Sequence, residues 1–372
     1  MAKVIHTILP YQTIGIIGGG QLGRMMALSA RAMGYKIAVL DPTPNCPCAQ
    51  VADIEITAGY NDISAIKKLA DVSDIITYEF ENIDYTALAY LEGHAYLPQG
   101  SNLLKISQHR YTEKQTILHM GIPVAPFSLI KTKEDLLNNV TYPSVLKTVT
   151  GGYDGKGQAV MREEADLGKG FSLIETQECI LEDWIPFTKE ISVIVTKSTI
   201  GETSVFPVAE NIHVENILHK SIVPARISAT VEENAIKTAR KIADELELIG
   251  TLAIEMFVTG NDEIYVNELA PRPHNSGHYS MDACKTGQFE QHIRAVCGLP
   301  LGATTLQTPV VMVNILGEHL TDLTKYIPLL SGGKLHLYGK EEVVVKRKMG
   351  HINVLCDDVE TALKNIDSVK IW

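Results

Sequence analysis

Residues 13–100 alternate short apolar runs with helical patterns, and this alternation constrains the fold more than any other feature of the chain. The segment at 21–33, between the first two runs, has the spacing of an amphipathic helix. Strands that alternate with helices form βαβ units, whose strands run parallel. The N-terminal part is therefore predicted to be an α/β domain with a doubly wound sheet. Its expected strands are residues 13–17, 36–40, 53–56 and 74–78.

Length, charge and cysteine usage limit the class of protein. A chain of 372 residues is long enough for two or three domains. Its net charge of −11 argues against a nucleic-acid-binding protein, which needs a basic surface. We see no secretory signal and no apolar run long enough to cross a bilayer, so no membrane partner is expected. The six cysteines form no pair of CxxC units, so we expect free thiols in a cytoplasmic protein rather than a zinc site.

The rest of the chain favours an α+β centre followed by a β-rich C-terminal part. Residues 105–120 resemble a helical connector, and residues 230–246 have the spacing of a long amphipathic helix. Over the last 70 or so residues we expect short strands, among them 310–315 and 343–346, and a final helix near 359–366.

Two carboxylates, Glu255 and Glu268, lie on apolar runs joined by a polar turn, which is typical of a β-hairpin. On a hairpin they can lie side by side, where they repel each other unless a cation lies between them. Carboxylate oxygens select Mg²⁺ or Mn²⁺, and Mg²⁺ is usually held by one or two carboxylates together with substrate phosphates. The chain continues into Arg272, His274 and Asn275, which can donate to an anion. The stretch predicts a metal–phosphate site beside an oxyanion site.

A lysine and a glycine-rich loop predict a second phosphate-binding element. Lys147 lies in the apolar run 143–148, and residues 151–158 read GGYDGKGQ before the next apolar run. Glycine turns let backbone N–H groups approach phosphate oxygens, and the following strand distinguishes this loop from a Walker A motif. We expect a flap over a nucleotide. A flexible hairpin with an exposed lysine is the alternative.

Residues 178–186 form a strand that runs into an acidic segment with an aromatic residue. Open backbone groups beside apolar walls can bind an adenine edge, and Glu190 could accept ribose hydroxyls. Taken singly, these residues also fit an ordinary surface strand.

The glycines at 18–23 offer a competing interpretation. They fit the GxGxxG fingerprint after a strand, and Asp41 closes the second strand, as in an NAD(P)-dependent oxidoreductase. Alternatively, the glycines only permit a tight turn with the helix N-terminus facing some anion. We favour the second interpretation because an oxidoreductase would leave Glu255, Glu268 and the glycine loop without a role.

Taken together, the motifs resemble the ATP-grasp superfamily and, within it, the N5-carboxyaminoimidazole ribonucleotide synthases. The resemblance runs from about residue 13 to the end, and the motifs come in the family's order. Lys156 stands where some relatives have arginine. The matching strings are GGGQLGRM at 18–25, YEFEN at 78–82, GYDGKG at 152–157, NELAPRPHNSGH at 267–278 and RKMGH at 347–351.

The resemblance implies an ATP-grasp fold in three parts and a homodimer. A Rossmann-like domain (1–104) binding no dinucleotide would precede the ATP-grasp domain (105–299, flap at about 123–185) and a small β-rich domain (300–372). It also implies that ATP and bicarbonate give carboxyphosphate, which carboxylates the amine of 5-aminoimidazole ribonucleotide.

The resemblance also implies roles for individual residues. Glu255 and Glu268 would hold the metal, and Arg272, His274, Asn275 and Lys340 would act in catalysis. His274 would transfer a proton, with a purely structural histidine as the alternative. The ribonucleotide would contact Gln21, Glu79, Tyr153, Lys340 and Arg347, with Lys348 as an alternative to the last two. ATP would contact Arg110, Lys147, Gly152, Tyr153, Asp154, Gly155, Lys156, Gly157, Gln158, Glu182, Asp183, Trp184, Ile185, Glu190, His213, Asn267 and Glu268.

Other functions stay open at this point. A formate-dependent ribonucleotide transformylase and an enzyme of the biotin carboxylase type share the ATP chemistry and differ in the second substrate. A catalytically silent nucleotide-binding scaffold is expected to lose a metal carboxylate or the flap lysine, and this chain retains both.

Overall fold

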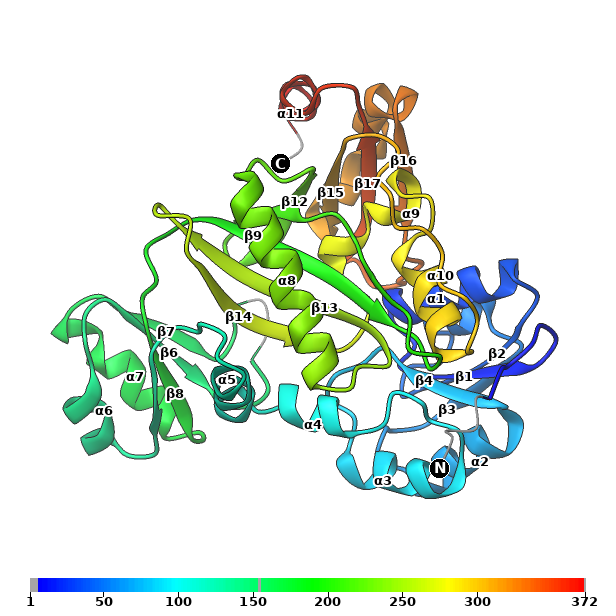
Figure 1. The fold of residues 1–372 in the computed structure, drawn as a ribbon, viewed down its shortest axis with the longest axis horizontal. Helices are drawn as coiled ribbons and strands as arrows, with labels where there is room; N and C mark the ends of the chain where they lie inside the picture. Colours follow the sequence, from blue (N-terminus) through cyan, green and yellow to red (C-terminus); the bar gives the residue numbers. More distant parts are fainter. Residues whose placement is uncertain (1–5, 153–154, 371–372) are drawn as a thin grey trace.

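The computed structural model describes residues 6–152 and 155–370. Within these residues the strands form three sheets, with helices packed on them (Figure 1). The N-terminal sheet lies at one end, a small sheet at the other, and a large sheet runs between them and continues into the C-terminal part.

The N-terminal sheet is parallel, with the strand order β3-β2-β1-β4. The predicted doubly wound α/β domain is therefore confirmed, and the four expected strands are each found within one or two residues. The elements of this part are β1 (Thr13–Ile17), α1 (Gln21–Ala32), β2 (Lys36–Asp41), the 3₁₀ turn η1 (Ala49–Val51), β3 (Ile54–Thr57), α2 (Ile63–Val72), β4 (Ile75–Tyr78) and α3 (Tyr85–His94).

Two short helices, α4 (Asn102–Ser107) and α5 (Arg110–His119), lead to the small antiparallel sheet. Its order is β5-β8-β6-β7, and β6 and β7 form the expected strand–loop–strand flap. The elements are β5 (Phe127–Ile130), α6 (Lys133–Asn139), β6 (Ser144–Thr148), β7 (Gln158–Met161), η2 (Glu164–Asp166), α7 (Leu167–Ile174) and β8 (Cys179–Asp183).

The large sheet has nine strands in the order β14-β13-β9-β11-β12-β15-β17-β16, with β10 paired to β9. Helix α8 covers it with the apolar stripe that the sequence predicts: Val231, Ala235, Ala239 and Ile242 are fully buried. The elements up to the hairpin are β9 (Phe187–Lys197), β10 (Thr203–Val205), β11 (Ala209–Val214), β12 (Ile217–Val223), α8 (Ala229–Glu245), β13 (Gly250–Thr259) and β14 (Ile264–Ala270).

The C-terminal strands extend the large sheet because β15 pairs with β12. The expected strand at 343–346 is wrong: the chain there is a loop, Lys346 has a φ of 66°, and β17 begins only at Lys348. Three adjacent valines suggest a strand, but in the structure they are exposed and unpaired with a sheet. The elements are η3 (Asn275–Gly277), α9 (Ser280–Ala283), α10 (Gln288–Val296), β15 (Val310–Leu316), η4 (Gly317–Ser331), β16 (Gly333–Leu337), β17 (Lys348–Leu355) and α11 (Val359–Ser368).

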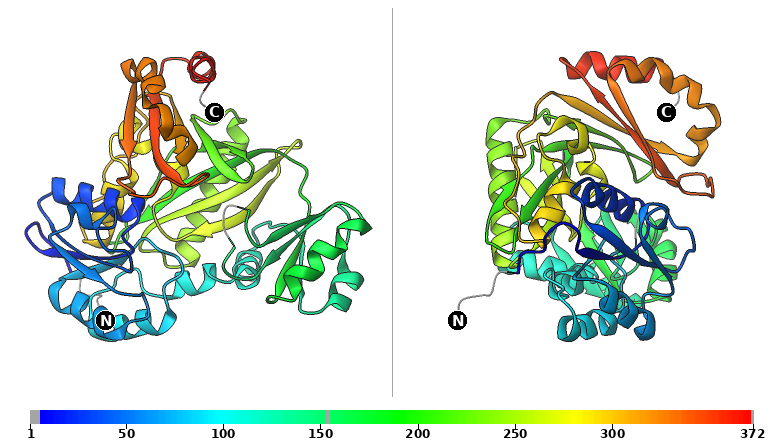
Figure 2. Two further views of the ribbon diagram at one scale, coloured as in Figure 1. Left: turned by 180° about the vertical axis from the view of Figure 1, so that it is seen from behind. Right: turned by 90° about the vertical axis from the view of Figure 1, so that its right-hand side faces the viewer.

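Helices α1 and α10 pack against each other in one apolar cluster that includes Met26, Phe289 and Ile293. This contact fixes the N-terminal sheet against the large sheet (Figure 2). As a result, the chain that follows β4 meets the segment that follows β14, where Arg272 forms an ion pair with Glu81. No helix in the described part of the chain is both long and apolar enough to span a membrane.

Candidate functional site

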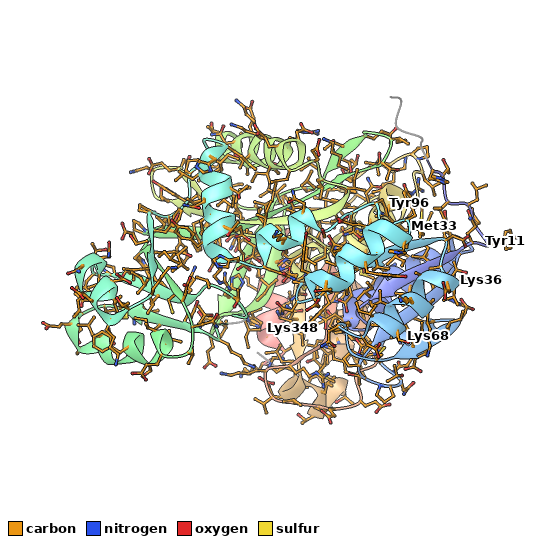
Figure 3. The ribbon with its side chains drawn as sticks, turned by 90° about the horizontal axis from the view of Figure 1, so that it is seen from below. Tyr11, Met33, Lys36, Lys68, Tyr96 and Lys348 are labelled. Atoms are coloured by element: carbon orange, nitrogen blue, oxygen red, sulfur yellow. The ribbon has the colours of Figure 1, made fainter. Side chains whose placement is uncertain are left out.

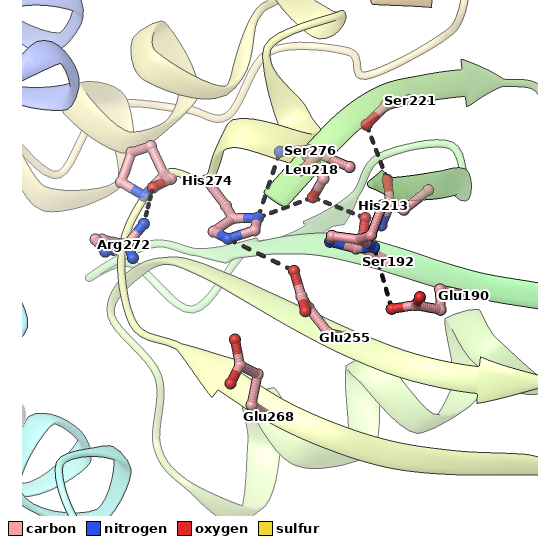
Figure 4. A network of polar contacts seen from close by, with 12 residues as sticks. Glu190, Ser192, His213, Leu218, Ser221, Glu255, Glu268, Arg272, His274 and Ser276 are labelled. Carbon is pink, nitrogen blue, oxygen red and sulfur yellow. Dashed lines mark hydrogen bonds and ion pairs between the residues drawn. The ribbon is translucent and has the colours of Figure 1, made fainter. Parts of the chain in front are cut away.

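The predicted carboxylate hairpin is confirmed. β13 and β14 are antiparallel, and Glu255 lies directly opposite Glu268. Residues opposite each other in an antiparallel pair project to the same face, and Figure 4 shows both side chains on one side of the sheet. A bulge after Glu255 interrupts the pairing next to Asn267, whose Oδ1 is buried without a hydrogen-bond partner.

The two carboxylates differ in their electrostatic environment. Burial, and then the charge of Glu268, raise the pKa of Glu255 to about 7. Burial acts in the same direction on Glu268, but Arg110 and Lys147 outweigh it and lower the pKa of Glu268. In residues 6–152 and 155–370 no cluster of three His, Cys, Asp or Glu side chains could enclose a metal. Two carboxylates open to substrate phosphates are the arrangement that suits Mg²⁺.

Arg110, at the start of α5, connects the carboxylate pair with the flap. Its guanidinium contacts Glu268 Oε2 at 3.2 Å and donates to the backbone oxygen of Gly152 at 2.9 Å. The predicted position of Arg110 beside the phosphate site is therefore consistent with the geometry.

The alternative interpretation required Lys147 to extend to the surface, but its side chain is directed into the protein. Its Nζ lies 2.9 Å from Glu182 Oε2, and the side chain of Glu182 is buried. A third group, which sequence reasoning missed, completes this contact: Lys114 of α5 is buried with its Nζ 3.4 Å from the same oxygen. Burial would raise the pKa of Glu182, but the two ammonium groups lower it to about 2. The result is a buried Lys–Glu–Lys cluster next to Arg110.

The flap closes toward the large sheet. Gly155 has a φ of 79°, and a side chain there would meet Asn216 of the β11–β12 turn at less than 3 Å. Gly157 accepts a hydrogen bond from the N–H of Thr148, opposite the start of β7 at Gln158. Tyr153 and Asp154 lie outside the described residues, and Lys156 lies between the two glycines.

The structure brings two predicted adenosine residues together: His213 Nδ1 lies 3.1 Å from Glu190 Oε2. Burial lowers the pKa of His213, but the carboxylates of Glu190 and Glu255 raise it above its ordinary value. In the neighbouring segment, the N–H groups of Asp183 and Trp184 donate to carbonyls of Pro126 and Pro143. These two amides are therefore already used within the protein, and the carbonyl oxygen of Ile185 also accepts a hydrogen bond, from the N–H of Phe187 at 2.8 Å.

The oxyanion residues follow β14 directly. Arg272 Nε lies 3.0 Å from Glu81 Oε1, and His274 Nε2 lies 3.6 Å from Glu255 Oε1. Asn275 is buried, and neither its Oδ1 nor its Nδ2 has a hydrogen-bond partner. A buried amide without partners is costly unless a ligand satisfies it, so Asn275 fits the predicted role.

The glycine turn at 18–23 is filled by the protein's own acids. The N–H of Gly19 donates to Asp41 Oδ2 and the N–H of Gly20 to Glu79 Oε1, each at 2.7 Å. A side chain at Gly19 would meet the sulfur of Cys46 at 2.1 Å. These N–H groups, which a dinucleotide pyrophosphate would need, are occupied, and this argues against the oxidoreductase interpretation. Gln21 begins α1 at the same edge.

Glu79 supports a prediction about stability. Burial raises its pKa to about 7. Between its unfolded pKa near 4.5 and this value, the folded protein binds more protons than the unfolded chain, so stability falls as the pH rises. We expect Glu79→Gln to match the wild type near pH 5 and to exceed it by about 2 kcal/mol at pH 8, in urea unfolding.

The control for this prediction is Glu92→Gln. Glu92 also accepts a backbone N–H at 2.7 Å, from Ser101, but it lies at the surface. The control should gain nothing at pH 8. Equal stability differences for Glu79→Gln at both pH values would contradict the prediction.

The predicted phosphate-binding cations lie between β16 and β17. Lys340 Nζ donates to the backbone oxygen of Lys348 at 2.7 Å and lies over the ring of Tyr338. Arg347 donates to Glu342 O within its own exposed loop. Burial, and then the charges of Arg272 and Lys348, lower the pKa of His274, and the charge of Lys348 also opposes the rise in the pKa of Glu255. Figure 3 shows Lys348 near the middle of the molecule.

The fold and the site define an ATP-grasp enzyme. The ATP-grasp domain family matches residues 115–289, the ribonucleotide synthetase preATP-grasp domain matches 11–108, and the phosphoribosylaminoimidazole carboxylase C-terminal domain matches 310–365. The N5-carboxyaminoimidazole ribonucleotide synthase of Bacillus subtilis is 58% identical over 358 residues, which are 95% of this chain and 94% of that protein. The chain belongs to the N5-carboxyaminoimidazole ribonucleotide synthase family.

Solved structures agree with this assignment. The N5-carboxyaminoimidazole synthetase of Staphylococcus aureus with ADP is 44% identical, with a TM-score of 0.94 and 98% coverage of both chains. The Aspergillus clavatus synthase, in complex with ADP and 5-aminoimidazole ribonucleotide, is 29% identical, with a TM-score of 0.91 and coverage of 97% of this chain and 98% of that one.

Proposed function

We infer that this protein is an ATP-dependent carbon–nitrogen ligase of purine biosynthesis. It carboxylates 5-aminoimidazole ribonucleotide with bicarbonate, giving N5-carboxyaminoimidazole ribonucleotide, ADP and phosphate. The structural observation that supports this inference most is the pairing of Glu255 with Glu268 across the hairpin. Arg110 contacts Glu268, and His274 of the oxyanion segment contacts Glu255.

We propose that Glu255 and Glu268 hold Mg²⁺, with Asn267 nearby. The raised pKa of Glu255 and the unpartnered Oδ1 of Asn267 both suit a cation at this position. When bound, Mg²⁺ would neutralise charge on the β- and γ-phosphates, and Mn²⁺ would be expected to substitute.

The remaining polar groups position the two reacting molecules. Lys147, Arg110 and the amides of the flap at 152–158 stabilise the phosphates, and the segment 182–185 with Glu190 and His213 binds adenosine. Phosphoryl transfer depends mainly on such positioning and charge stabilisation. A bicarbonate oxygen attacks the γ-phosphorus, and ADP leaves.

Arg272, Asn275 and His274 then hold the carboxyphosphate oxygens as oxyanion donors. The amine of the ribonucleotide attacks the carboxyl carbon, the bond from that carbon to the phosphate oxygen breaks, and the departing phosphate takes the proton that the amine loses. Gln21 and Glu79 lie at the carboxyl ends of the parallel strands, where such sheets bind ligands, and we assign them to the imidazole or ribose.

An assay of ADP release tests this function. ADP release with bicarbonate should rise on addition of 5-aminoimidazole ribonucleotide and should not rise with formate or biotin. Stimulation by formate or biotin instead would move the protein to a sister enzyme. Oxidation of NADH would restore the oxidoreductase interpretation. No ADP release under any of these conditions would favour a catalytically silent nucleotide-binding scaffold.

Replacing Lys340 by Ala should raise the KM for the ribonucleotide by at least about tenfold, because a charge-assisted hydrogen bond to phosphate is lost. The same change at Arg347 tests the second predicted cation. The KM for ATP should change little. Lys334→Ala, on the exposed side of β16, is the control. Equal rises for both substrates would show that Lys340 and Arg347 do not bind the ribonucleotide phosphate.

We further propose the domain division 1–104, 105–299 and 300–372, a homodimer, and a cytoplasmic location. The positions of the matched domain families support the division, and six free cysteines suit a reducing compartment. Sedimentation of the purified protein distinguishes a monomer from a dimer.

A further inference from the structure

Two buried serines form a hydrogen-bonded chain that ends on the oxyanion segment. Ser192 Oγ donates to Ser276 Oγ at 2.7 Å, and Ser276 Oγ lies 2.9 Å from His274 Nδ1. Both serines are almost completely inaccessible to solvent. The chain is drawn in Figure 4.

Ser192 is placed in register with the carboxylates. It lies opposite Glu255 on the neighbouring strand, and Glu255 lies opposite Glu268, so the three side chains form one row across β9, β13 and β14. Ile191 and Val193, which flank Ser192 along β9, are buried in the core on the opposite face of the strand. The Ser192 hydroxyl therefore lies on the face of the carboxylates, where it meets Ser276.

The hydrogen bonds decide which ring nitrogen of His274 carries the proton. The backbone N–H of Ser276 also donates to His274 Nδ1, at 3.3 Å. A backbone N–H can only donate, so Nδ1 is the acceptor and is unprotonated. Since Ser192 donates to Ser276, the Ser276 hydroxyl is left to donate to the same nitrogen. In the neutral ring the proton then lies on Nε2, the atom nearest Glu255.

We propose that Ser192 and Ser276 are positioning residues that hold His274 as a hydrogen-bond donor, with its N–H on Nε2 directed to the side of the metal carboxylates. His274 then supports the bicarbonate-derived oxyanion by donating to it, and does not act as a base. This inference rests on the proposed function for the identity of the oxyanion. The tautomer itself follows from the contacts alone.

The kinetic test compares three variants with a matched control. Ser276→Ala and Ser192→Ala should each lower kcat/KM for bicarbonate by about tenfold and leave the KM for ATP unchanged. The double variant should lose no more than the larger single loss, because the two hydroxyls act through one nitrogen. Ser221→Ala is the control: this buried serine of β12 lies in the same sheet, but its hydroxyl donates to Asn211 Oδ1 at 2.8 Å and is engaged there.

A spectroscopic test does not depend on activity. In the full-length protein with ¹⁵N-labelled histidine rings, the signals absent from a His274→Gln variant belong to His274. They should show the proton on Nε2. The double serine variant keeps the 3.3 Å contact from the backbone N–H of residue 276 but loses the 2.9 Å contact from the hydroxyl, so it should keep this tautomer as the main form and gain a minor population with the proton on Nδ1. A proton on Nδ1 in the wild type, or serine variants that behave like Ser221→Ala, would overturn the proposal. Absence of bicarbonate-dependent ADP release in the wild type would refute the proposed function and leave this result standing.

Discussion

Glu268→Gln is expected to lower bicarbonate-dependent ADP release by about 10³-fold, because it removes one of the two charges proposed to hold Mg²⁺ at the transferred phosphate. Glutamine keeps the shape of the side chain and can still accept a hydrogen bond from Arg110, which lies 3.2 Å away. The loss therefore measures the negative charge, and with it the proposed metal site, rather than a change in packing.

The variant should remain folded. Glu255 and Glu268 repel each other in the metal-free protein, and this repulsion contributes to the raised pKa of Glu255. Removing the charge of Glu268 relieves this repulsion but also removes its attraction to Arg110 and Lys147, so the metal-free variant should stay folded, with a melting temperature within about 5 °C of the wild type. Glu263→Gln, in the exposed turn of the same hairpin, is the control. A Glu268→Gln enzyme within tenfold of the wild type would remove Glu268 from the metal site.

The elements that could be predicted are those whose pattern is local. The hairpin that carries Glu255 and Glu268 is such a case, since two apolar runs and a polar turn fix both the pairing and the face. The parallel N-terminal sheet and the buried stripe of α8 are others. In each case the period of apolar residues is enough to determine what is buried.

The parts that sequence reasoning missed depend on contacts between distant segments. Lys114 lies on a short helix, and nothing in its neighbours indicates that it reaches Glu182, 68 positions further along the chain. The role of Ser192 could not be predicted either, because its hydrogen-bond partner, Ser276, follows a different strand. The only sign of it in the sequence is that Ser192 is a polar residue within the apolar run 191–195. The prediction of a strand at 343–346 is wrong because it rests on local preference alone. The valines favour a strand, but no neighbouring strand pairs with them.

The Lys–Glu–Lys cluster leads to the largest expected effect on stability. Glu182→Gln should lower the free energy of unfolding by about 3–5 kcal/mol, because it leaves two ammonium groups without their shared counter-charge. The side chain of Lys114 is only 2% exposed and cannot turn to water. Lys114→Met should cost less, since Glu182 keeps Lys147 at 2.9 Å. Urea unfolding at pH 7 measures both variants, and a larger loss for Lys114→Met would contradict this account.

The dependence on pH gives the same prediction a second test. The pKa of Glu182 is lowered to about 2 in the folded protein, so its stabilising contribution is present above the unfolded pKa near 4.5 and is lost as the pH falls toward 2. The difference between wild type and Glu182→Gln should therefore shrink over that range. Glu178→Gln provides the matched control, because Glu178 pairs with Lys131 at 2.9 Å near the start of the same strand but at the surface. An exposed pair contributes less than about 1 kcal/mol, so a loss at Glu178 as large as that at Glu182 would show that burial does not set the strength of the cluster.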